Sequence, residues 1–426
     1  MTGGSWSNLA AEMSLYMATF EELSGQSNQS DLQRRSTLGN PVMKAIHPLN
    51  YGLAGIGACV LSAVVVGILQ DSMQSPAVWL HDPLAADAVV EQGPAATDET
   101  EAGSGNPQPA EAPGSLARPS QEDLNFNSVL NPSAGSGPVL ETSFGAVEIF
   151  PGDNPWNTRI DQLPVHSKSD TWIQSIGADT RLHPDFGTVW QGRPNGIPFV
   201  VVSPAQAGSR VAFEYADESD VGPYPIPPNP PIEGGPDAEP GSDRHLIMID
   251  PRKKLLYELF QVFPRARGGW KAGSGAIFDL STNRVRPAGW TSADAAGLPI
   301  FPGLVRYDEV AAGEIRHALR FTVEKTQRGY IFPARHFASR SDDRRLPPLG
   351  LRVRLKKDFD SSRFPESVRV ILICLQRYGM LLADNGGDWF ISGAPDQRWS
   401  DEELSTLKRI TGHDLECVVT GLITRM

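Results

Sequence analysis

Residues 366–384 read ESVRVILICLQRYGMLLAD, and this stretch predicts how the globular part is built. Its first half carries apolar residues at helical spacing: Val368, Ile371, Leu372 and Leu375. Gly379 follows, and glycine is common just past the end of a helix. The next residues, Met380–Asp384, are apolar up to the final acid, as in a buried strand. The pattern predicts a helix over Glu366–Tyr378 that leads directly into a strand.

Further apolar runs between turn residues predict a domain dominated by β-strands. Many runs are β-branched or aromatic, and half of them alternate with period two. The predicted strands are Ile197–Val202, Val211–Tyr215, Leu246–Ile249, Leu255–Phe263, Ala276–Leu280, Ile315–Val323, Tyr330–Phe332, Leu351–Leu355, Met380–Asp384, Trp389–Ser392 and Leu415–Val419. Strands do not alternate with helices, which argues against a doubly wound parallel sheet. We expect a β-rich α+β fold with a β-sandwich or jelly-roll-like core and a few C-terminal helices.

Two shorter helices are expected besides the one over Glu366–Tyr378. Ser400–Glu403 forms a capping box, which predicts a helix through Ile410. Trp399 and Leu404 have the spacing of a hydrophobic staple around its first turn. Asp170–Ile176 is the second candidate helix.

An uncharged segment near the N-terminus predicts a membrane anchor. Residues 49–69 (LNYGLAGIGACVLSAVVVGIL) contain 21 residues without a charge, close to the roughly 20 that span a bilayer as a helix. Basic residues precede this segment and acids follow it: Arg34, Arg35 and Lys44, then Asp71 and Asp82. The positive-inside rule then makes residues 1–48 a cytoplasmic tail. We expect a single-pass membrane protein whose globular domain is periplasmic or at the cell surface.

Other interpretations of this segment stay open. Met43 and Lys44 resemble the start of a signal sequence. In that interpretation, residues 1–48 contain a misassigned start instead of forming a cytoplasmic tail. Cys59 lies in a loose lipoprotein processing box, although the apolar run continues beyond it. A buried core helix is the remaining alternative for residues 49–69.

Residues 70–140 have the composition of a disordered, acidic linker rich in Pro, Gly and Ala. Residues 71–140 hold ten acids and one base, a net charge of −9 out of −12 for the whole chain. Few large apolar residues are available there to bury. The composition changes near Phe144, so residues 141–426 are expected to form a single β-rich globular domain.

Composition and missing motifs exclude several classes of function. The negative net charge argues against a nucleic-acid-binding protein, which needs a basic surface. Three cysteines are too few for a disulfide scaffold; Cys374 and Cys417 are expected to be buried, and export would also permit them to pair. The chain has no Gly-x-Ser-x-Gly, phosphate-binding loop, His-Glu-x-x-His or dinucleotide fingerprint.

A proline-rich stretch interrupts the strand pattern. Residues 223–240 (PYPIPPNPPIEGGPDAEP) hold eight prolines and must form an extended loop, because proline cannot donate to a sheet ladder. Acids surround it: Glu214, Asp217, Glu218, Asp220, Glu233, Asp237, Glu239 and Asp243. This loop is either a cleft wall, a calcium-binding loop or a solvated surface insertion.

Three Arg-His pairs are candidates for chemistry: Arg244-His245, Arg316-His317 and Arg335-His336. In the predicted strand Glu314–Phe321, alternation places His317 on the apolar face and Glu314 and Arg316 on the other. A buried histidine of this kind is commonly a hydrogen-bonded core residue. If the histidines converge, they offer metal ligands. No motif requires a cofactor, so we expect none, with calcium or zinc as the alternative.

We expect one polar cleft at the ends of neighbouring strands around residues 306–336. Antiparallel pairing would bring the segments before and after the Glu314 strand together. The expected acid–base residues are His317, Glu314, Asp308, Asp279 and His336. The expected substrate-binding residues are Arg306, Arg316, Arg335, Tyr307 and Trp290. Aromatic platforms for sugar rings lie near turns: Trp156, Trp190, Trp270, Trp290, Tyr307 and Trp389.

Several strings resemble a family of exported bacterial proteins that has no assigned activity. They are Phe150–Asn157 (FPGDNPWN), Leu182–Gly187 (LHPDFG), Glu314–Phe321 (EIRHALRF), Ala334–His336 (ARH), Ala383–Gly386 (ADNG) and Ser392–Asp396 (SGAPD). The likeness covers residues 148–420 and excludes the predicted anchor and linker. It implies work at the cell surface or on polysaccharide, and it transfers no catalytic residue.

We therefore expect a membrane-tethered, extracytoplasmic, carbohydrate-active protein. The expected activity is polysaccharide cleavage by a glycoside hydrolase or lyase that uses carboxylate and histidine acid–base chemistry. The alternatives are a non-catalytic protein that binds glycan or the cell envelope, and a structural surface protein. A convergent pocket with carboxylate, His and Arg favours the enzyme, whereas a flat aromatic strip without paired acids favours the binder.

Overall fold

A six-stranded sheet lies at the centre of one half of the structure, a computed structural model that describes residues 135–239 and 241–425. Its strand order is β18-β15-β16-β13-β17-β3. The strands are β3 (His183–Asp185), β13 (Leu319–Val323), β15 (Arg352–Leu355), β16 (Met380–Asn385), β17 (Phe390–Ser392) and β18 (Leu415–Cys417). Every residue of β13 and β15 is buried, so both faces of the sheet are covered there.

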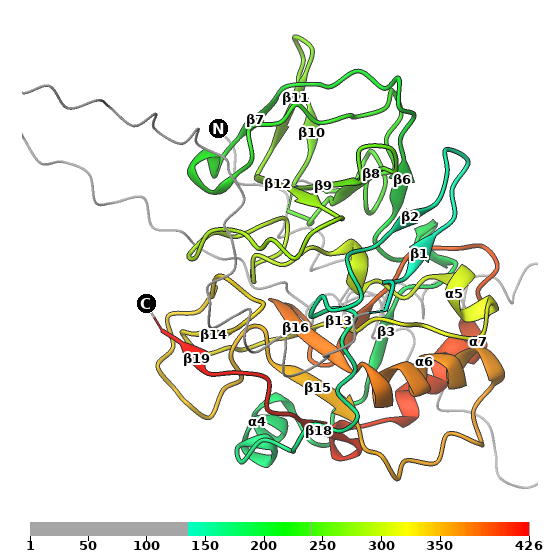
Figure 1. Ribbon diagram of the computed structural model, residues 1–426, viewed down its shortest axis with the longest axis vertical. Coiled ribbons are helices and arrows are strands. Elements are labelled where there is room, and N and C mark those ends of the chain that lie inside the picture. The colour runs from blue at the N-terminus through cyan, green and yellow to red at the C-terminus, as the bar shows by residue number, and fades with distance from the viewer. Residues whose placement is uncertain (1–134, 240, 426) are drawn as a thin grey trace, which may run out of the picture. The chain divides into compact units, whose positions relative to one another are not determined.

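A four-stranded sheet with the order β12-β9-β8-β6 lies in the other half (Figure 1). It contains β6 (Phe199–Val201), β8 (Leu246–Asp250), β9 (Leu255–Phe260) and β12 (Ser274–Asp279). A three-stranded sheet contains β7 (Val211–Phe213), β10 (Phe263–Pro264) and β11 (Trp270–Ala272). Three short pairs are β1 (Val139–Leu140) with β2 (Val147–Glu148), β4 (Val189–Trp190) with β5 (Arg193–Pro194), and β14 (Tyr330–Ile331) with β19 (Ile423–Thr424).

The fold is β-rich α+β, as the sequence predicts, but its sheets are mixed. A β-sandwich or jelly roll is built from antiparallel strands, whereas β13 pairs in parallel with β16, β17 with β3, and β6 with β8. Parallel neighbours need a crossover connection. Between β13 and β16 that connection contains β14, β15 and the longest helix, so the pairing differs from the expected hairpin arrangement.

The apolar core joins the two large sheets, and β8 separates it from a smaller core. Ile247 and Ile249 of β8 belong to the main core, whereas Leu246 and Met248 belong to the second. This alternation follows from the opposite directions of successive side chains in a strand. On β9, Leu256 belongs to the main core, so Glu258, two residues later, points the same way.

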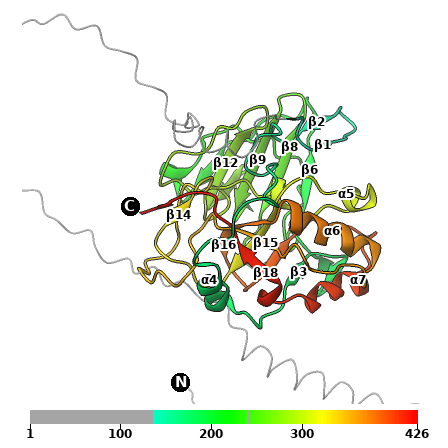
Figure 2. The same ribbon diagram turned by 60° about the horizontal axis from the view of Figure 1, so that its bottom comes forward.

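Four α-helices are found in the described part of the chain. They are α4 (Ser169–Ile176), α5 (Tyr307–Ala311), α6 (Glu366–Arg377) and α7 (Asp401–Ser405), with 3₁₀ turns η1 (Ala216–Glu218), η2 (Phe301–Gly303), η3 (Thr406–Arg409) and η4 (Gly412–Asp414). The predicted helices α4 and α6 are confirmed. Helix α6 buries its predicted apolar face and contacts β15 (Figure 2). Gly379 has φ 64°, the left-handed value expected of a residue past a helix end.

Helix α7 is shorter than predicted, and only half of its capping box forms. The Ser400 hydroxyl accepts from the Glu403 N–H at 3.2 Å, but the Glu403 carboxylate accepts from the Ser367 hydroxyl of α6 instead. The Thr406 hydroxyl donates to the Glu403 carbonyl where the α-helix ends. The chain continues as the tighter turn η3, so the predicted helix through Ile410 changes type halfway.

Replacing Ser400 with alanine will lower the free energy of unfolding by about 1 kcal/mol, because it removes the N-cap acceptor of α7. Urea denaturation of the full-length chain measures the change. The control is Ser405→Ala in the same helix, whose hydroxyl bonds only to the Glu402 carbonyl. Equal, negligible effects of the two substitutions would show that the cap does not stabilise the helix.

The strand predicted over Ile315–Val323 begins only at Leu319. The chain leaves α5 through Gly313, whose φ is 86°, and residues 314–318 are irregular. Glu314 and Arg316 are exposed as expected, but Arg320 is buried. The predicted polar face of this strand therefore faces the interior from Arg320 onward.

No helix in residues 135–239 and 241–425 is long and apolar enough to cross a membrane. The predicted anchor over residues 49–69, the tail over residues 1–48 and nearly all of the predicted linker lie outside the described residues.

Candidate functional site

The loop over residues 290–297 connects the two large sheets. The His245 imidazole, next to β8, bonds the Ala293 carbonyl, and the Ser274 hydroxyl of β12 donates to Ser292 O. On the other side, Ala295 N–H donates to Asp384 Oδ2, at 3.2 Å, on β16. Asp294 lies between these contacts and is fully buried. The loop thus carries a buried carboxylate to the junction of the two sheets.

Arg320 of β13 is the partner of that carboxylate. Its Nε and Nη2 donate to the two oxygens of Asp294 at 2.9 and 2.7 Å, which is a bidentate pair. Its Nη1 donates to the Ser392 hydroxyl of β17 at 2.7 Å. Burial alone would lower the pKa of Arg320, whereas the charge and the hydrogen bonds of Asp294 raise it. The net result is a pKa above the usual value, so the guanidinium stays charged.

Asp384 reaches the same place because β16 contains a β-bulge. Phe321 pairs with Leu382, but Thr322 pairs with Asp384, so Ala383 is the extra residue. Without that residue, the Asp384 side chain would point to the opposite face of the sheet. Instead, its Oδ2 lies 3.7 Å from Arg320 Nη2.

Asp384 and Asp294 both reach Arg320 Nη2, Asp294 Oδ1 at 2.7 Å and Asp384 Oδ2 at 3.7 Å, so the two carboxyl groups lie side by side. Burial, and then the charge of Asp294, raise the pKa of Asp384 well above its usual range. Its side chain is 27% exposed, so water still reaches it. Asp384 is therefore a water-accessible carboxyl with a raised pKa.

Asp185 ends strand β3 at the same edge of the six-stranded sheet. It pairs with Ser392, the residue that Arg320 bonds. The carboxyl is exposed to water, although nearby protein atoms replace much of its hydration. This desolvation, and then the charge of Glu233, raise the pKa of Asp185 to about 6. We call Asp185, Asp294, Arg320 and Asp384 the carboxylate centre.

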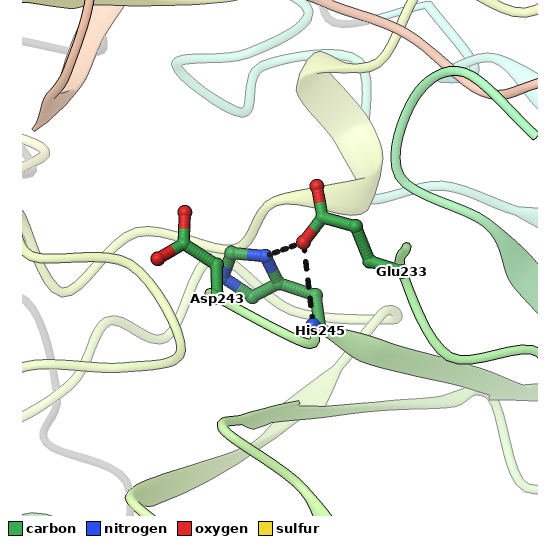
Figure 3. A group of neighbouring side chains, drawn as sticks. All are labelled: Glu233, Asp243 and His245. Carbon is green, nitrogen blue, oxygen red and sulfur yellow. Dashed lines mark hydrogen bonds and ion pairs between the residues drawn. The ribbon is translucent and has the colours of Figure 1, made fainter. Parts of the chain in front are cut away.

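Glu233, Asp243 and His245 form a second group, which comes from the proline-rich loop and the residues before β8 (Figure 3). His245 is buried; its Nδ1 lies 2.7 Å from Glu233 Oε2, and its Nε2 lies 3.0 Å from the Ala293 carbonyl oxygen. Burial alone would lower the pKa of His245, but Glu233 raises it to about 9. Burial alone would raise the pKa of Glu233, but His245 lowers it.

Arg244 fastens the proline-rich loop next to this group. Its buried guanidinium donates to the carbonyl oxygens of Gly235, Pro236 and Ala238, and to Val262 O. The loop has few N–H groups of its own because of its prolines, so its carbonyls are satisfied by an arginine. This arrangement fixes Glu233, two residues before Gly235, beside His245.

Glu258 on β9 is a completely buried carboxyl on the side of the main core. It accepts from the backbone N–H groups of Ile300 and Phe301 at 2.8–2.9 Å. Burial raises the pKa of Glu258 to about 7, against the lowering effect of these hydrogen bonds. Because water does not reach it, Glu258 positions the η2 turn rather than contacting a ligand.

An exposed tryptophan lies next to the proline-rich loop. Trp190 is 67% exposed on the β4–β5 hairpin, five residues after Asp185. Arg193 of the same hairpin donates to the carbonyl oxygens of Gly234 and Asp237. The hairpin is therefore attached to the loop that carries Glu233. Of the other expected platforms, Trp156 and Trp389 are buried.

Arg306 and His317, predicted to act together, are in contact, but they are enclosed. Arg306 Nη2 lies 3.3 Å from His317 Nε2, and both bond Glu309 of α5, at 2.6 and 3.1 Å. His317 Nδ1 bonds the Ala318 carbonyl. The pKa of Glu309 is raised by burial alone, but Arg306 and His317 lower it. This is the hydrogen-bonded core arrangement that the sequence left open for His317.

The expected acids on either side of His317 point to solvent. The Asp308 side chain is 77% exposed and pairs with Arg398, which lies over the Tyr307 ring. Glu314 is also exposed and pairs with Arg377. These contacts keep the two acids apart from the Arg306–His317 contact.

The remaining predicted residues lie in three other places. Asp279 ends β12 and accepts from Ser281, a turn interaction. Arg316 is exposed and donates to the Ser136 carbonyl at 3.4 Å. Arg335 and His336 adjoin the loop over residues 290–297: the Arg335 Nε donates to Arg286 O, and His336 Nδ1 bonds Ala295 O at 2.9 Å.

Trp290 lies at the start of that loop, under the Arg286 guanidinium. Cys374 and Cys417 are buried and unpaired. The structure therefore divides the predicted residues among separate groups instead of gathering them in one cleft.

Asp294 is not among the residues predicted from the sequence, and Asp384 is predicted only as the last residue of a strand. Arg320 and Asp185 occur only within the EIRHALRF and LHPDFG strings. Glu233, Asp243 and His245 were noted, but as separate features. Two signals in the sequence point toward the second group: the acids around the proline-rich loop and the Arg244-His245 pair.

A pocket beside the loop over residues 290–297 is lined by Phe150, Asn154, Pro155, Trp156, Phe278, Arg284, Val285, Gly297, Leu298, Pro299 and Pro333. Most of these side chains are apolar. The lining includes no member of the carboxylate centre and no member of the Glu233 group.

No family model, no curated protein and no solved structure matches this chain. Roles for its residues follow from their geometry and chemistry. The carboxylate centre combines an acid whose pKa is raised well above its usual range, an acid whose pKa is raised to about 6 and a buried arginine–carboxylate pair.

Proposed function

We propose that this domain is a polysaccharide-cleaving enzyme, a glycoside hydrolase or lyase, in which Asp384 and Asp185 are the acid–base residues. The observation that carries the proposal is that Asp294 and Asp384 meet at Arg320, while Asp185 pairs across the sheet with Ser392, whose hydroxyl also bonds Arg320. Water reaches Asp185 and Asp384 but not Asp294. The two accessible acids are thus available to a substrate, whereas Asp294 is a positioning residue.

The roles of the two acids follow from their surroundings. Cleavage of a glycosidic bond needs a proton donor and a second group that accepts a proton or attacks. Burial, and then the charge of Asp294, raise the pKa of Asp384, which suits the proton donor. Asp185 ionises near pH 6 and is the base or nucleophile. Arg320 holds Asp294 in place beside Asp384.

Trp190 supports glycan as the substrate. An exposed indole offers an apolar face on which a sugar ring can stack while its hydroxyls bond polar neighbours. The hairpin that bears Trp190 follows Asp185 directly in the chain, and Arg193 attaches it to the proline-rich loop. The expected topology, with an anchor at residues 49–69 and the domain outside the cytoplasm, would expose this surface to envelope polysaccharide.

The same tryptophan also favours a second candidate function, a non-catalytic module that binds glycan or the cell envelope. In that case, Trp190→Ala would abolish binding, and substitutions in the carboxylate centre would leave it unchanged. An enzyme would need both Trp190 and the carboxylate centre.

A degradation screen with the full-length chain on neutral and acidic polysaccharides tests the proposal. We expect cleavage of at least one polymer, detected as new reducing ends or as unsaturated products. Asp185→Asn should abolish it. The matched controls Asp308→Asn and Glu314→Gln should stay active, because these exposed acids contact only surface arginines.

The opposite pattern, with activity lost in the two controls and kept in Asp185→Asn, would contradict the carboxylate centre and support the site expected from the sequence. Binding of a polymer without cleavage would identify the protein as the non-catalytic module.

A further inference from the structure

We infer that Glu233, Asp243 and His245 bind one divalent transition-metal ion, and that zinc matches this set best. One potential ligand atom of each side chain lies within 4.8 Å of the other two (Figure 3). Zinc takes nitrogen and carboxylate-oxygen ligands at about 2.0–2.2 Å, so its ligand atoms lie about 3–4 Å apart. Small side-chain rotations would therefore bring the three atoms around one ion.

The hydrogen bond on the far side of the imidazole indicates which nitrogen binds the metal. The Ala293 carbonyl oxygen can only accept, so His245 Nε2 carries a proton and donates to it. Histidines that bind metals commonly donate their other ring N–H to a backbone carbonyl, which fixes the ring. His245 Nδ1 is then the ligand atom, and it faces Glu233.

The charges around Nδ1 call for a cation. A neutral imidazole nitrogen and a carboxylate oxygen 2.7 Å apart would repel each other without a positive charge between or beside them. That charge is either a proton or a metal ion. Glu233 and Asp243 offer two carboxylates, so a divalent ion would compensate both, whereas a single proton compensates one.

Asp243 has the freedom that a metal ligand needs. Its side chain is exposed, and no hydrogen bond to its carboxylate is found among the described residues. Glu233 is held more firmly, since Oε2 also accepts from the His245 backbone N–H at 3.3 Å. Glu233 is thus fixed beside His245, whereas the Asp243 side chain can move. This arrangement leaves one side of the ion open to water or substrate.

The ligand set favours zinc over calcium. Calcium takes six to eight oxygen ligands, and this group offers one imidazole and two carboxylates. Imidazole suits zinc and related transition metals. The site is distinct from the carboxylate centre and does not depend on the proposed cleavage activity.

Isothermal titration of the metal-free full-length chain with zinc chloride tests the inference. We expect one site per chain that is weakened at least tenfold by Asp243→Asn and by Glu233→Gln. Zinc should also raise the melting temperature of the wild type but not of these two variants. The control is Glu324→Gln, whose exposed carboxylate pairs only with Lys325, and it should bind as the wild type does.

Cobalt in place of zinc provides a second readout, because a visible absorption band reports nitrogen and oxygen coordination of low symmetry. The band should be absent in His245→Gln, and circular dichroism of that variant shows whether it is folded. If the wild type binds no zinc, or if all variants bind as tightly as it does, a proton alone occupies the group and the inference is wrong. Binding of calcium but not zinc would equally overturn it.

Discussion

Replacing Arg320 with methionine will lower the free energy of unfolding by about 3–5 kcal/mol, because the substitution leaves a buried carboxylate without its partner. Asp294 is fully buried and receives two hydrogen bonds from Arg320. Methionine has a similar length but cannot donate. The Ser392 hydroxyl loses its donor as well, so three contacts disappear together.

A double-mutant cycle in urea separates the lost pair from lost packing. Adding Asp294→Asn to Arg320→Met removes the stranded charge and should restore part of the stability. The control is Arg345→Met, an exposed arginine paired with Asp343, which should unfold as the wild type does. If Arg320→Met proves as harmless as this control, Asp294 is not held as a buried carboxylate.

Replacing Asp384 with asparagine will lower kcat for glycan cleavage by about 10²–10⁴-fold, the usual contribution of a general acid. The amide has the same shape and can still donate to Asp294, so the fold should persist. KM should change little, because the proton moves only in the transition state. The measurement is the steady-state rate on the polymer found in the screen, with Asp308→Asn as the control. An Asp384→Asn enzyme with wild-type kcat would remove Asp384 from the mechanism.

The acid limb of the pH profile should report Asp185. A base must be ionised, so kcat/KM should fall tenfold per pH unit below about pH 6, the pKa of Asp185.

The raised pKa of Asp185 also affects the free energy of unfolding, with a pH dependence opposite to that of kcat/KM. Folded Asp185 keeps its proton to about pH 6, whereas an unfolded aspartate loses it near pH 4. The stability contributed by this group is therefore lost as the pH rises from about 4 to 6.

Local sequence patterns predicted the elements well. Helix α6 was found because its apolar residues repeat with the period of a helix and Gly379 ends it. The strands were found because the burial of alternate or successive residues leaves apolar runs. The proline-rich loop was predicted because missing N–H groups exclude a sheet. Each of these features depends on residues that are close together in the chain.

Local sequence patterns could not predict that the sheets contain both parallel and antiparallel strand pairs. An apolar run such as β16 looks the same whether its neighbour is parallel or antiparallel, and the crossover through β14, β15 and α6 is decided by packing. The site expected around Glu314 and His317 failed to assemble for the same reason. The prediction of that site depended on antiparallel pairing of a strand that begins at Glu314. In the structure, the chain before Leu319 is irregular and Glu314 points to solvent.

The sequence by itself determined that residues 366–385 form a helix and a strand, that residues 223–240 form a loop, and that acids gather near it. Only the tertiary structure decided which polar residues meet. The sequence pattern around Arg320 is the same whether its side chain faces water or a second sheet. One extra residue, Ala383, decides where the Asp384 side chain points. Burial and side-chain direction depend on contacts between distant segments, and those contacts assemble the carboxylate centre and place His245 beside Glu233.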